Sequence, residues 1–568
     1  SCEFTFTVYD AAGNVVRSLC STQNLVSPET ATTDADTKVT VYEYDTLGRR
    51  IKTIANYVNG VYSAATPQED QTTLIVYDAL DRVVRTIVNY VPVAGISTPY
   101  TAAHSAFAAH HGSDNTENLV TDTVYDARGL VSQQIDVLGN VTCSIYDDAG
   151  RLVRTLVNYV AQGGSDPTTW VWDALDGRWE YGSGSPVDHG ANNDQNLITE
   201  QGYDHVGNLV KTVDALRNVR YTAFDELNRP VKTVRNAKDT ATILLVAGQS
   251  GYDATNDPRS SSYVPSTAAD RDLIEITEYD ALGRVIRTRR LLDNSSTALW
   301  EVNLNGYDTA GRLVRSIRNA STPEYDLNAD PDLSGYSLSS AADKDILTTT
   351  VYDTDGRVQY TEDVLNRKAR QVYDGLGRTF RSISNYLPQG TPETDPGTWV
   401  WDSATDNRWE QAAGTAVGLG TGYDQNQISH TEYDADGHVR WTQDVQGRKT
   451  WHVYDTHGRR IKTIVNCTYN GTGTAPESPS YTGSSDPDKD VITRTEYNTW
   501  GQVWKTFDAA GIETRSEYDA LGRQTRTTTN YVDGVFSGAV PDEDLIQTTT
   551  YDAAGRVLTS TDARGTVT

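Results

Sequence analysis

One short phrase, Tyr-Asp-x-x-Gly-Arg/Asn, recurs along the whole chain and constrains its fold more than any other feature. Clear copies begin at Tyr9, Tyr44, Tyr125, Tyr146, Tyr203, Tyr279, Tyr307, Tyr352, Tyr373, Tyr433, Tyr454, Tyr518 and Tyr551, and degenerate copies begin at Tyr77, Phe224 and Tyr497. Asp in the first turn position can bond its own backbone, and Gly accepts the left-handed conformation of a bulge. The phrase therefore predicts a β-hairpin turn, and the Val-, Ile- and Thr-rich flanks favour strands on both sides.

The spacing of the copies predicts how the hairpins are joined. Five neighbouring pairs of copies lie 21 residues apart, and a second turn falls midway in each pair, at Asp136, Asp214, Asp363, Asp444 and Asp508. A longer period repeats whole inserts, since Trp170-Val-Trp172 returns as Trp399-Val-Trp401. The sequence predicts an all-β solenoid or spiral of hairpins without significant helix.

The same periods predict four segments along the chain. These are an N-terminal unit with a joint region (1–43), a first six-hairpin module (44–278), a second module (279–517) and a partial third module (518–568).

Composition narrows the function. Of 568 residues, 49 are Lys or Arg and 77 are Asp or Glu, a net charge of −28 that argues against a nucleic-acid partner. Residues 243–247 form the longest apolar run, which is too short to span a membrane. Arg outnumbers Lys 38 to 11, which suits pairing with carboxylates and stacking on aromatic rings. The absence of Met and the start at Ser1 lead us to expect a processed chain or a stretch of a longer one.

The repeated phrase resembles the RHS/YD-repeat family, which includes bacterial RHS and wall-associated repeat proteins, the cocoon subunits of Tc toxins and the YD shell of teneurins. The resemblance extends from Tyr9 to Gly565. It implies an all-β spiral of hairpins, which in the toxins and teneurins curls into a hollow shell. The family's closing region, with Asp-Pro motifs and a self-cleavage site, has no counterpart here. We therefore expect the fold to carry over and toxin encapsulation not to.

No catalytic motif is present, so we expect no enzymatic activity and no cofactor. One acidic run, Asp326, Asn328, Asp330 and Asp332, alternates oxygen ligands as a calcium loop does. Pro331 and Ser337 stand where an EF-hand needs Gly and Glu, so a solvated acidic loop is the alternative. A second run, residues 486–490, has the same two interpretations.

Pairs of aspartates precede several strands, at Asp270/Asp272, Asp343/Asp345, Asp488/Asp490 and Asp542/Asp544. They are interpreted either as gatekeepers that stop strand edges from pairing wrongly or as a cation-dependent contact between turns of the spiral.

Two further residue sets have both a functional and a structural interpretation. The indoles of Trp170, Trp172, Trp179, Trp399, Trp401 and Trp409 could form a platform for sugar rings or pack the inserts onto the sheet. Asn140, Asn294, Asn319, Asn466 and Asn470 begin N-glycosylation sequons.

The chain ends lead us to expect head-to-tail stacking, because an open solenoid leaves strand edges unpaired. The next molecule's first strand would complete the last hairpin, at a joint formed by Cys2, Tyr9, Tyr551 and Thr568, with an intermolecular disulfide at Cys2. The alternative is that the repeats continue in a longer polypeptide.

These observations favour a non-enzymatic extracellular or cell-surface structural protein that forms a filament, sheath or stalk. The alternatives are a segment of an RHS- or Tc-type shell and a carbohydrate-binding adhesin in contact with cell-wall polysaccharide.

Overall fold

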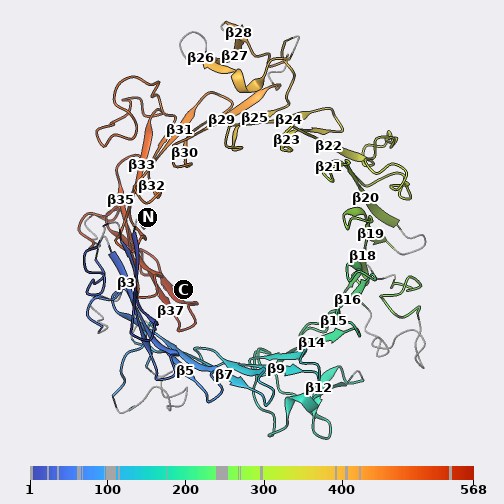
Figure 1. The fold of residues 1–568 in the computed structure, drawn as a ribbon, viewed down its shortest axis with the longest axis vertical. Helices are drawn as coiled ribbons and strands as arrows, with labels where there is room; N and C mark the ends of the chain where they lie inside the picture. The colour runs from blue at the N-terminus through green and yellow to red at the C-terminus, as the bar shows by residue number, and fades with distance from the viewer. Residues whose placement is uncertain are drawn as a thin grey trace. The chain divides into compact units, whose positions relative to one another are not determined.

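The chain is all-β, as the repeats predict (Figure 1). A computed structural model describes residues 4–21, 23, 25–34, 37–60, 66, 68–94, 96, 110–112, 115–173, 175–237, 254–266, 268, 270–293, 299–390, 393–402, 407–412, 414–420, 424–536 and 540–568. These residues form a 32-stranded antiparallel sheet and two small three-stranded sheets, with two single-turn 3-10 helices and no α-helix. None of the described helices could cross a membrane.

The main sheet contains β1 (Phe4–Tyr9), β2 (Val15–Ser21), β3 (Thr37–Tyr44), β4 (Arg50–Ala55), β5 (Gln71–Tyr77), β6 (Val83–Val88), β7 (Leu119–Tyr125), β8 (Val131–Ile135), β9 (Val141–Tyr146), β10 (Leu152–Val157), β14 (Leu197–Tyr203), β15 (Leu209–Val213), β16 (Val219–Phe224), β17 (Pro230–Arg235), β18 (Leu273–Tyr279) and β19 (Val285–Asp293). It continues with β20 (Leu299–Tyr307), β21 (Leu313–Arg318), β22 (Ile346–Tyr352), β23 (Val358–Asp363), β24 (Lys368–Tyr373), β25 (Thr379–Ser384), β29 (Gln427–Tyr433), β30 (Val439–Gln443), β31 (Lys449–Tyr454), β32 (Arg460–Val465), β33 (Val491–Tyr497), β34 (Val503–Phe507), β35 (Glu513–Tyr518), β36 (Gln524–Thr529), β37 (Leu545–Tyr551) and β38 (Val557–Thr561).

The small sheets stand in two equivalent inserts. One holds η1 (Pro167–Thr169), β11 (Val171–Asp173), β12 (Arg178–Tyr181) and β13 (Ser185–Pro186). The other holds η2 (Pro396–Thr398), β26 (Val400–Asp402), β27 (Arg408–Ala412) and β28 (Thr415–Ala416). By compactness the chain divides into residues 1–197 with 451–568, and residues 198–450. The four segments expected from the sequence periods remain a prediction.

Every copy of the phrase ends a strand, which confirms the predicted hairpin turn: each Tyr, or Phe224, is the last residue of its strand. In the copy at Tyr307, Asp308 Oδ1 accepts hydrogen bonds from the backbone N–H groups of Ala310 (3.0 Å) and Arg312 (2.8 Å). Gly311 follows with a φ of 82°, in the left-handed region that a side chain disfavours. The register then shifts at Tyr307, as a bulge requires.

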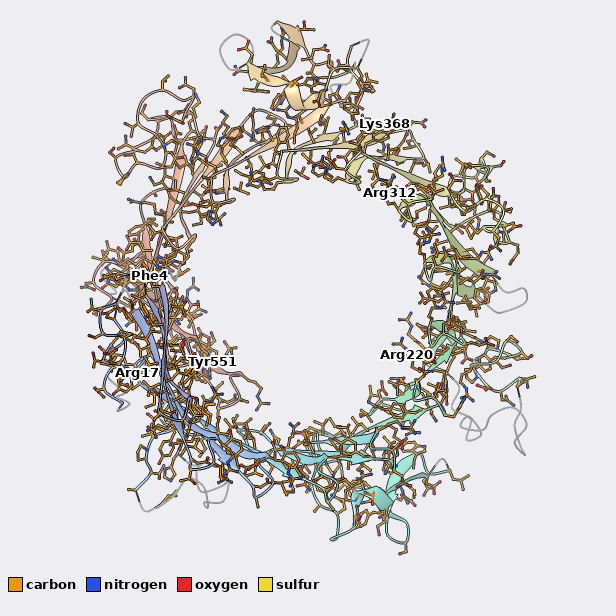
Figure 2. The ribbon with its side chains drawn as sticks, in the orientation of Figure 1. Phe4, Arg17, Arg220, Arg312, Lys368 and Tyr551 are labelled. Carbon is orange, nitrogen blue, oxygen red and sulfur yellow. The ribbon has the colours of Figure 1, made fainter. Side chains whose placement is uncertain are left out.

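Tyrosine and arginine of the phrase link most hairpins to their neighbours, a role that the sequence did not reveal. Arg312, labelled in Figure 2, pairs with Asp308 through its Nε (2.8 Å). Its guanidinium carbon lies 4.6 Å from the ring centroid of Tyr352, in the following hairpin. The Tyr352 hydroxyl donates a hydrogen bond to the Leu313 carbonyl (2.9 Å). The same tyrosine bond occurs at Tyr44, Tyr77, Tyr125, Tyr146, Tyr279, Tyr307, Tyr373, Tyr433, Tyr497, Tyr518 and Tyr551.

We expect Tyr352→Phe to destabilise the β21–β22 pair by about 0.5–1.5 kcal/mol, the net value of one hydrogen bond. Hydrogen exchange of the amides of β21 and β22 measures this loss. Phe224 lies naturally in the same position, so Phe224→Tyr is the matched reverse change and should slow exchange in β15 and β16. Equal exchange in Tyr352→Phe and the unchanged protein would show that the hydroxyl contributes nothing.

One row of the core lies at the position nine residues after each turn aspartate that precedes a clasped insert. Ile87, Leu156 and Ile464 are fully buried there, and Ile54, Val234, Ile317 and Ile383 are 1–3% exposed. Thr528, 2% exposed, takes the place in the last of these hairpins. The inserts therefore bury the apolar side chains that a single exposed sheet would leave in water.

Each of eight inserts is closed by a clasp, which we define as an Asn eleven residues after the turn aspartate together with the residue just before the next strand. The Asn residues are 56, 89, 158, 236, 319, 385, 466 and 530, and the closing residues are Asp70, Asn118, Asn196, Asp272, Asp345, Asn426, Asp490 and Asp544. All sixteen have φ between 47° and 53°, which Asn and Asp tolerate best among residues with side chains. The closing N–H donates to the Asn carbonyl over 2.9–3.1 Å.

The closing aspartates anchor the inserts, which corrects the gatekeeper interpretation for the second member of each acidic pair. Asp490 is 6% exposed. Its carboxylate accepts hydrogen bonds from the Thr468 N–H and hydroxyl (2.8 and 2.6 Å), the Tyr481 hydroxyl (2.6 Å) and the Ser484 N–H (3.0 Å). A carboxylate satisfied inside its own loop does not face a strand edge.

Candidate functional site

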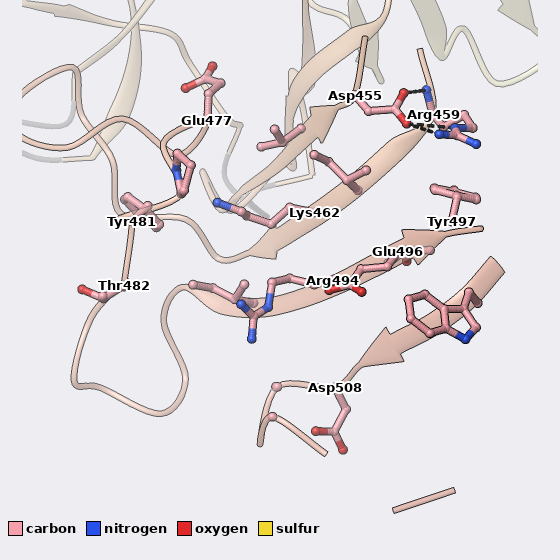
Figure 3. Close-up of a pocket in the computed structure, with 18 residues that line it drawn as sticks. Asp455, Arg459, Lys462, Glu477, Tyr481, Thr482, Arg494, Glu496, Tyr497 and Asp508 are labelled. Atoms are coloured by element: carbon pink, nitrogen blue, oxygen red, sulfur yellow. Dashed lines mark hydrogen bonds and ion pairs between the residues drawn. The ribbon is translucent and has the colours of Figure 1, made fainter. Parts of the chain in front are cut away.

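Two equivalent cavities, of about 790 and 800 Å³, lie where inserts meet the sheet. The first is drawn in Figure 3, where the side chains of Lys462, Arg494 and Tyr481 come from the sheet and from the insert above it. The matching lining residues are Asp455 and Asp225, Arg459 and Arg229, Lys462 and Lys232, Tyr481 and Tyr263, Glu496 and Glu278, and Tyr497 and Tyr279. The same cavity is therefore built twice by the long sequence period.

Lysine and tyrosine side chains that line these cavities form hydrogen bonds with residues of the inserts. Lys232 Nζ donates to the Ser260 carbonyl (2.7 Å), and burial lowers the pKa of this amine to about 8. Lys462 Nζ donates to the Pro476 and Ser478 carbonyls (3.0 Å each), and burial lowers its pKa as well. The Tyr263 hydroxyl donates to Asp272 (2.6 Å). These contacts fasten the inserts to the sheet, so the cavities follow from insert packing.

The expected calcium residues lie in one insert, where donors of the loop itself occupy their carboxylates. Asp326 Oδ1 accepts from the Asn328 N–H (3.0 Å), and Asp332 Oδ1 accepts from the Ser334 N–H (3.0 Å). Asp330 Oδ2 accepts from the Tyr325 hydroxyl (2.7 Å), which lowers the pKa of this carboxyl to about 2. Calcium binding remains a prediction.

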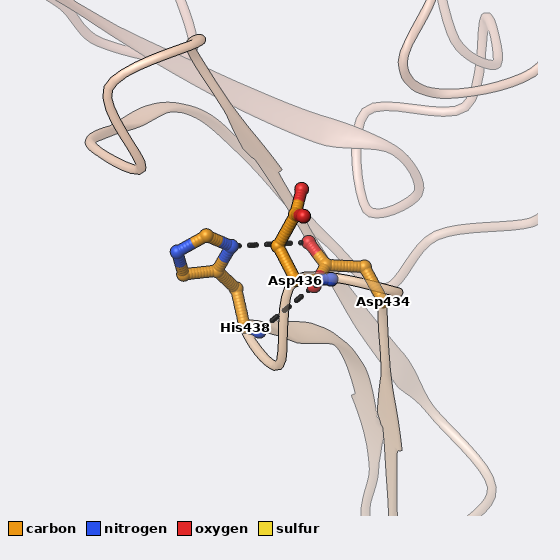
Figure 4. Close-up of side chains that lie close together, drawn as sticks. All are labelled: Asp434, Asp436 and His438. Carbon is orange, nitrogen blue, oxygen red and sulfur yellow. Dashed lines mark hydrogen bonds and ion pairs between the residues drawn. The ribbon is translucent and has the colours of Figure 1, made fainter. Parts of the chain in front are cut away.

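Two other acidic groups bring possible ligand atoms together among the described residues. They are Asp434, Asp436 and His438, drawn in Figure 4, and Asp173, Asp176 and Glu180. In the first, Asp434 Oδ1 accepts the N–H groups of Asp436 and His438, as in every turn of the repeat. In the second, Arg178 pairs with Asp176 and Glu180. Turn geometry and ion pairing account for both groups.

The predicted indoles mostly lie inside their inserts. Trp170 and Trp399 are 1% exposed, and Trp179 and Trp409 are 4% and 7% exposed. Trp172 and Trp401 meet Trp179 and Trp409 edge to face, with ring centroids 5.9 and 5.8 Å apart. This arrangement fits the packing interpretation, and sugar binding stays a prediction.

The sequon asparagines lie in three kinds of position. Asn319 and Asn466 are clasp residues whose Nδ2 atoms donate to the Asp343 and Asp488 carbonyls (2.7 Å each). Asn140 Nδ2 donates to Asp136 in a turn (2.9 Å), and Asn470 is exposed. Asn294 lies outside the described residues.

Three of the four residues expected at a head-to-tail joint, Tyr9, Tyr551 and Thr568, are among the described residues. Tyr9 is 60% exposed, and Cys2 lies outside the described residues. Thr568 exchanges backbone hydrogen bonds with Ser560 (2.8 and 2.9 Å), so the chain's own last residues lie beside β38. Cys143 and Cys467 are buried and free, and Cys20 is disulfide-bonded. The joint remains a prediction.

A contact between distant segments, which we call the seam, is the feature that sequence reasoning missed. Side-chain amides of Gln68, Gln71 and Asn115 donate to the backbone carbonyls of Asp519, Ala520 and Tyr551, respectively. Lys38 Nζ lies 3.7 Å from the ring centroid of Trp500. The seam thus joins inserts and strand starts to hairpin turns and a strand end that lie 436–462 residues further along, within one compact unit.

Burial supports the seam independently of the hydrogen bonds. Asp519 and Ala520 are 5% and 2% exposed, and Ala553 is 6% exposed. The equivalents of Ala520 in two other hairpins, Thr46 and Ala79, are exposed. The hairpin turns, which together we call the turn edge, are therefore covered where the seam lies and exposed in these other hairpins.

The pKa shifts predict a two-stage loss of stability in acid. Burial, aided by Arg381 and Lys449, lowers the pKa of His430 from 6.5 to about 4, so the unfolded chain binds this proton first and stability falls from pH 6.5 to 4. Hydrogen bonds from Arg312 lower the pKa of Asp308, and turn aspartates such as Asp45 and Asp374 behave alike. Their contribution is present above about pH 4 and disappears as pH falls through the folded pKa.

Thermal unfolding followed by circular dichroism from pH 7 to 2 measures both stages. We expect a shallow fall in Tm and then a steep one below pH 4, and His430→Phe should flatten only the first. A Tm that is constant down to pH 2 would contradict the assigned roles of the turn aspartates.

No protein-family model and no curated protein matches the chain. Among solved structures, the crystal structure of TcdB2-TccC3-TEV is 14% identical and covers 98% of this chain and 28% of its own, with a TM-score of 0.26. For TcdB2-TccC3 the values are 15%, 98%, 30% and 0.24, and for a Photorhabdus luminescens Tc holotoxin pore 13%, 98%, 31% and 0.24. The chain spans less than a third of these proteins, and similarity this low carries no functional argument.

Proposed function

We propose that the chain is a non-enzymatic structural protein, a stretch of β-wall that packs on itself edge to edge as a segment of an RHS-type shell. The observation that carries this proposal is the seam, in which amide side chains of one edge meet turn carbonyls of the other. The repeated Tyr–Arg contacts and clasps support it, since they serve to hold hairpins and inserts in place.

The seam favours a wall that closes on itself over an open fibre. Both sides of the seam belong to the same chain. The groups that form it are therefore not available to bind a second molecule, as a fibre would require. The extracellular filament, sheath or stalk expected from the sequence remains the alternative. That alternative requires copies to join through their ends or edges.

Electron microscopy and sedimentation of the purified chain in near-physiological salt test the proposal. We expect discrete particles of one chain each. Long fibres with a regular axial repeat would overturn the wall and favour the filament.

A seam variant sharpens this test. Gln68→Asp with Gln71→Leu should open the seam and raise the frictional ratio without changing the mass. Gln427→Leu is the matched control, because Gln427 follows its closing residue as Gln71 does but lies outside the seam. An unchanged frictional ratio in the seam variant would count against self-packing.

A further inference from the structure

We propose that exposed aspartates bar the rest of the insert edge from stacking on the turn edge of a second copy, and that replacing them opens a self-docking surface. The inference rests on the proposed function, because it assumes that the seam is how edges of this protein meet. It concerns one position in each clasped insert, two residues before the closing residue.

The residue at this position separates inserts in the seam from the others. Gln68 and Thr116 stand there in the two clasped inserts that supply seam contacts. The six other clasped inserts have Asp194, Asp270, Asp343, Asp424, Asp488 and Asp542, all of them exposed. The insert between Ser21 and Thr37 also makes a seam contact, through Lys38, but it has no clasp asparagine and is not one of the eight clasped inserts.

The clasp itself does not require a carboxylate at this position. In all six inserts the clasp Asn donates to the backbone carbonyl of the aspartate, and in the Thr116 insert Asn89 donates to the Thr116 carbonyl in the same way. The backbone carbonyl thus serves the clasp with either residue type, and at Asp424 the carboxylate adds only a longer bond from Asn385 Nδ2 (3.4 Å). In the seam, Gln68 meets the Asp519 carbonyl.

The hairpin turns present backbone carbonyls, which accept hydrogen bonds. The charge of the residue two before the closing residue therefore decides whether an insert can stack on these turns. An amide can donate to a turn carbonyl, whereas a carboxylate has no proton to donate and would lose its hydration against an oxygen. Like-sign contacts of this kind are a common means of excluding unwanted partners. The aspartates thus act as guards against stacking, while Gln68 permits it.

The turn edge that a second copy would offer is open in many hairpins. The third turn residue is a leucine that is 69–79% exposed in five of them, at Leu47, Leu80, Leu227, Leu282 and Leu376. In the seam hairpin its equivalent, Leu521, is 36% exposed. Because turn edges are open and insert edges are guarded, the insert edge sets whether copies associate.

One insert lies a single substitution away from the seam pattern. Residues 424–427 read Asp-Gln-Asn-Gln, and residues 68–71 read Gln-Glu-Asp-Gln. Asp424→Gln therefore recreates the pair of amides, with the same spacing, that binds Asp519 and Ala520.

The test is sedimentation velocity of a triple variant, Asp270→Gln with Asp343→Gln and Asp424→Gln, at 1–50 µM (roughly the range in which weak self-association is seen). We expect a dimer dissociation constant at least tenfold lower than that of the unchanged chain. The control, Glu29→Gln with Glu275→Gln and Glu362→Gln, makes the same change in net charge and should sediment as the unchanged chain does.

A second variant tests whether the new pair of amides causes the association. Adding Gln427→Leu to the triple variant removes one amide of the new pair and should reverse most of the association. A triple variant that stays monomeric, or a control that associates equally, would overturn the guard. Neither outcome would affect the proposed wall, which is tested by the seam variant in the unchanged background.

Discussion

Replacing Asp490 with Ala will release the insert of residues 466–490 from the sheet while leaving the hairpins on both sides intact. The Asp490 carboxylate is the common acceptor for one side of this insert, and its removal leaves the Thr468 N–H, the Tyr481 hydroxyl and the Ser484 N–H without partners. An unsatisfied donor costs about 1–3 kcal/mol when it is buried. These donors are only partly buried, so water and relaxation of the loop recover part of that cost. We expect a local loss of about 3–5 kcal/mol.

Limited proteolysis and hydrogen exchange of residues 466–490 measure the release. Asp488→Ala is the matched control, because the Asp488 side chain is exposed and only its carbonyl serves the clasp. We expect rapid cleavage within the insert in Asp490→Ala and none in Asp488→Ala. Equal protection in the two variants would mean that the closing carboxylate does not hold the insert.

Trp399→Ala should cost about as much, through lost packing. The Trp399 indole is 1% exposed and packs with Ile383, Trp409 and Ile428, where the insert covers β25 and β29. Truncating a buried Trp to Ala typically costs about 3–5 kcal/mol, because the cavity that remains collapses only in part.

Near-UV circular dichroism and proteolysis of residues 393–420, without any sugar present, measure this loss. Trp504→Ala is the control, since Trp504 is 42% exposed and its removal should cost less than about 1 kcal/mol. If the insert stays protected from proteolysis in Trp399→Ala, the indole does not hold it by packing. A ligand-binding role for the indole would then be worth testing.

The fold could be predicted from the sequence because its information is local. All sixteen copies of the phrase end a strand, and the second turns at Asp136, Asp214, Asp363, Asp444 and Asp508 lie where the spacing placed them. The conformation of a turn depends on a few adjacent residues, so its repeated phrase can be recognised in the sequence.

The clasp and the seam could not be predicted in the same way. The clasp had a signal, an Asn eleven residues after eight turn aspartates, but its partner lies beyond an insert of variable length. Within the acidic pairs, nothing in the neighbouring sequence distinguishes the buried Asp490 from the exposed Asp488. The seam joins residues about 450 apart, and no single-sequence pattern specifies such a pairing.

The seam is tested most directly by trapping it covalently. In a chain carrying Gln71→Cys and Ala520→Cys, a short bismaleimide should join the two thiols within one molecule, and peptide mass spectrometry should identify the link. Ala281→Cys in place of Ala520→Cys is the control, because it occupies the same turn position in another hairpin. A dominant intramolecular link between positions 71 and 520 is the result that the self-packing wall predicts. A ladder of cross-linked oligomers, or no link at all, would contradict it.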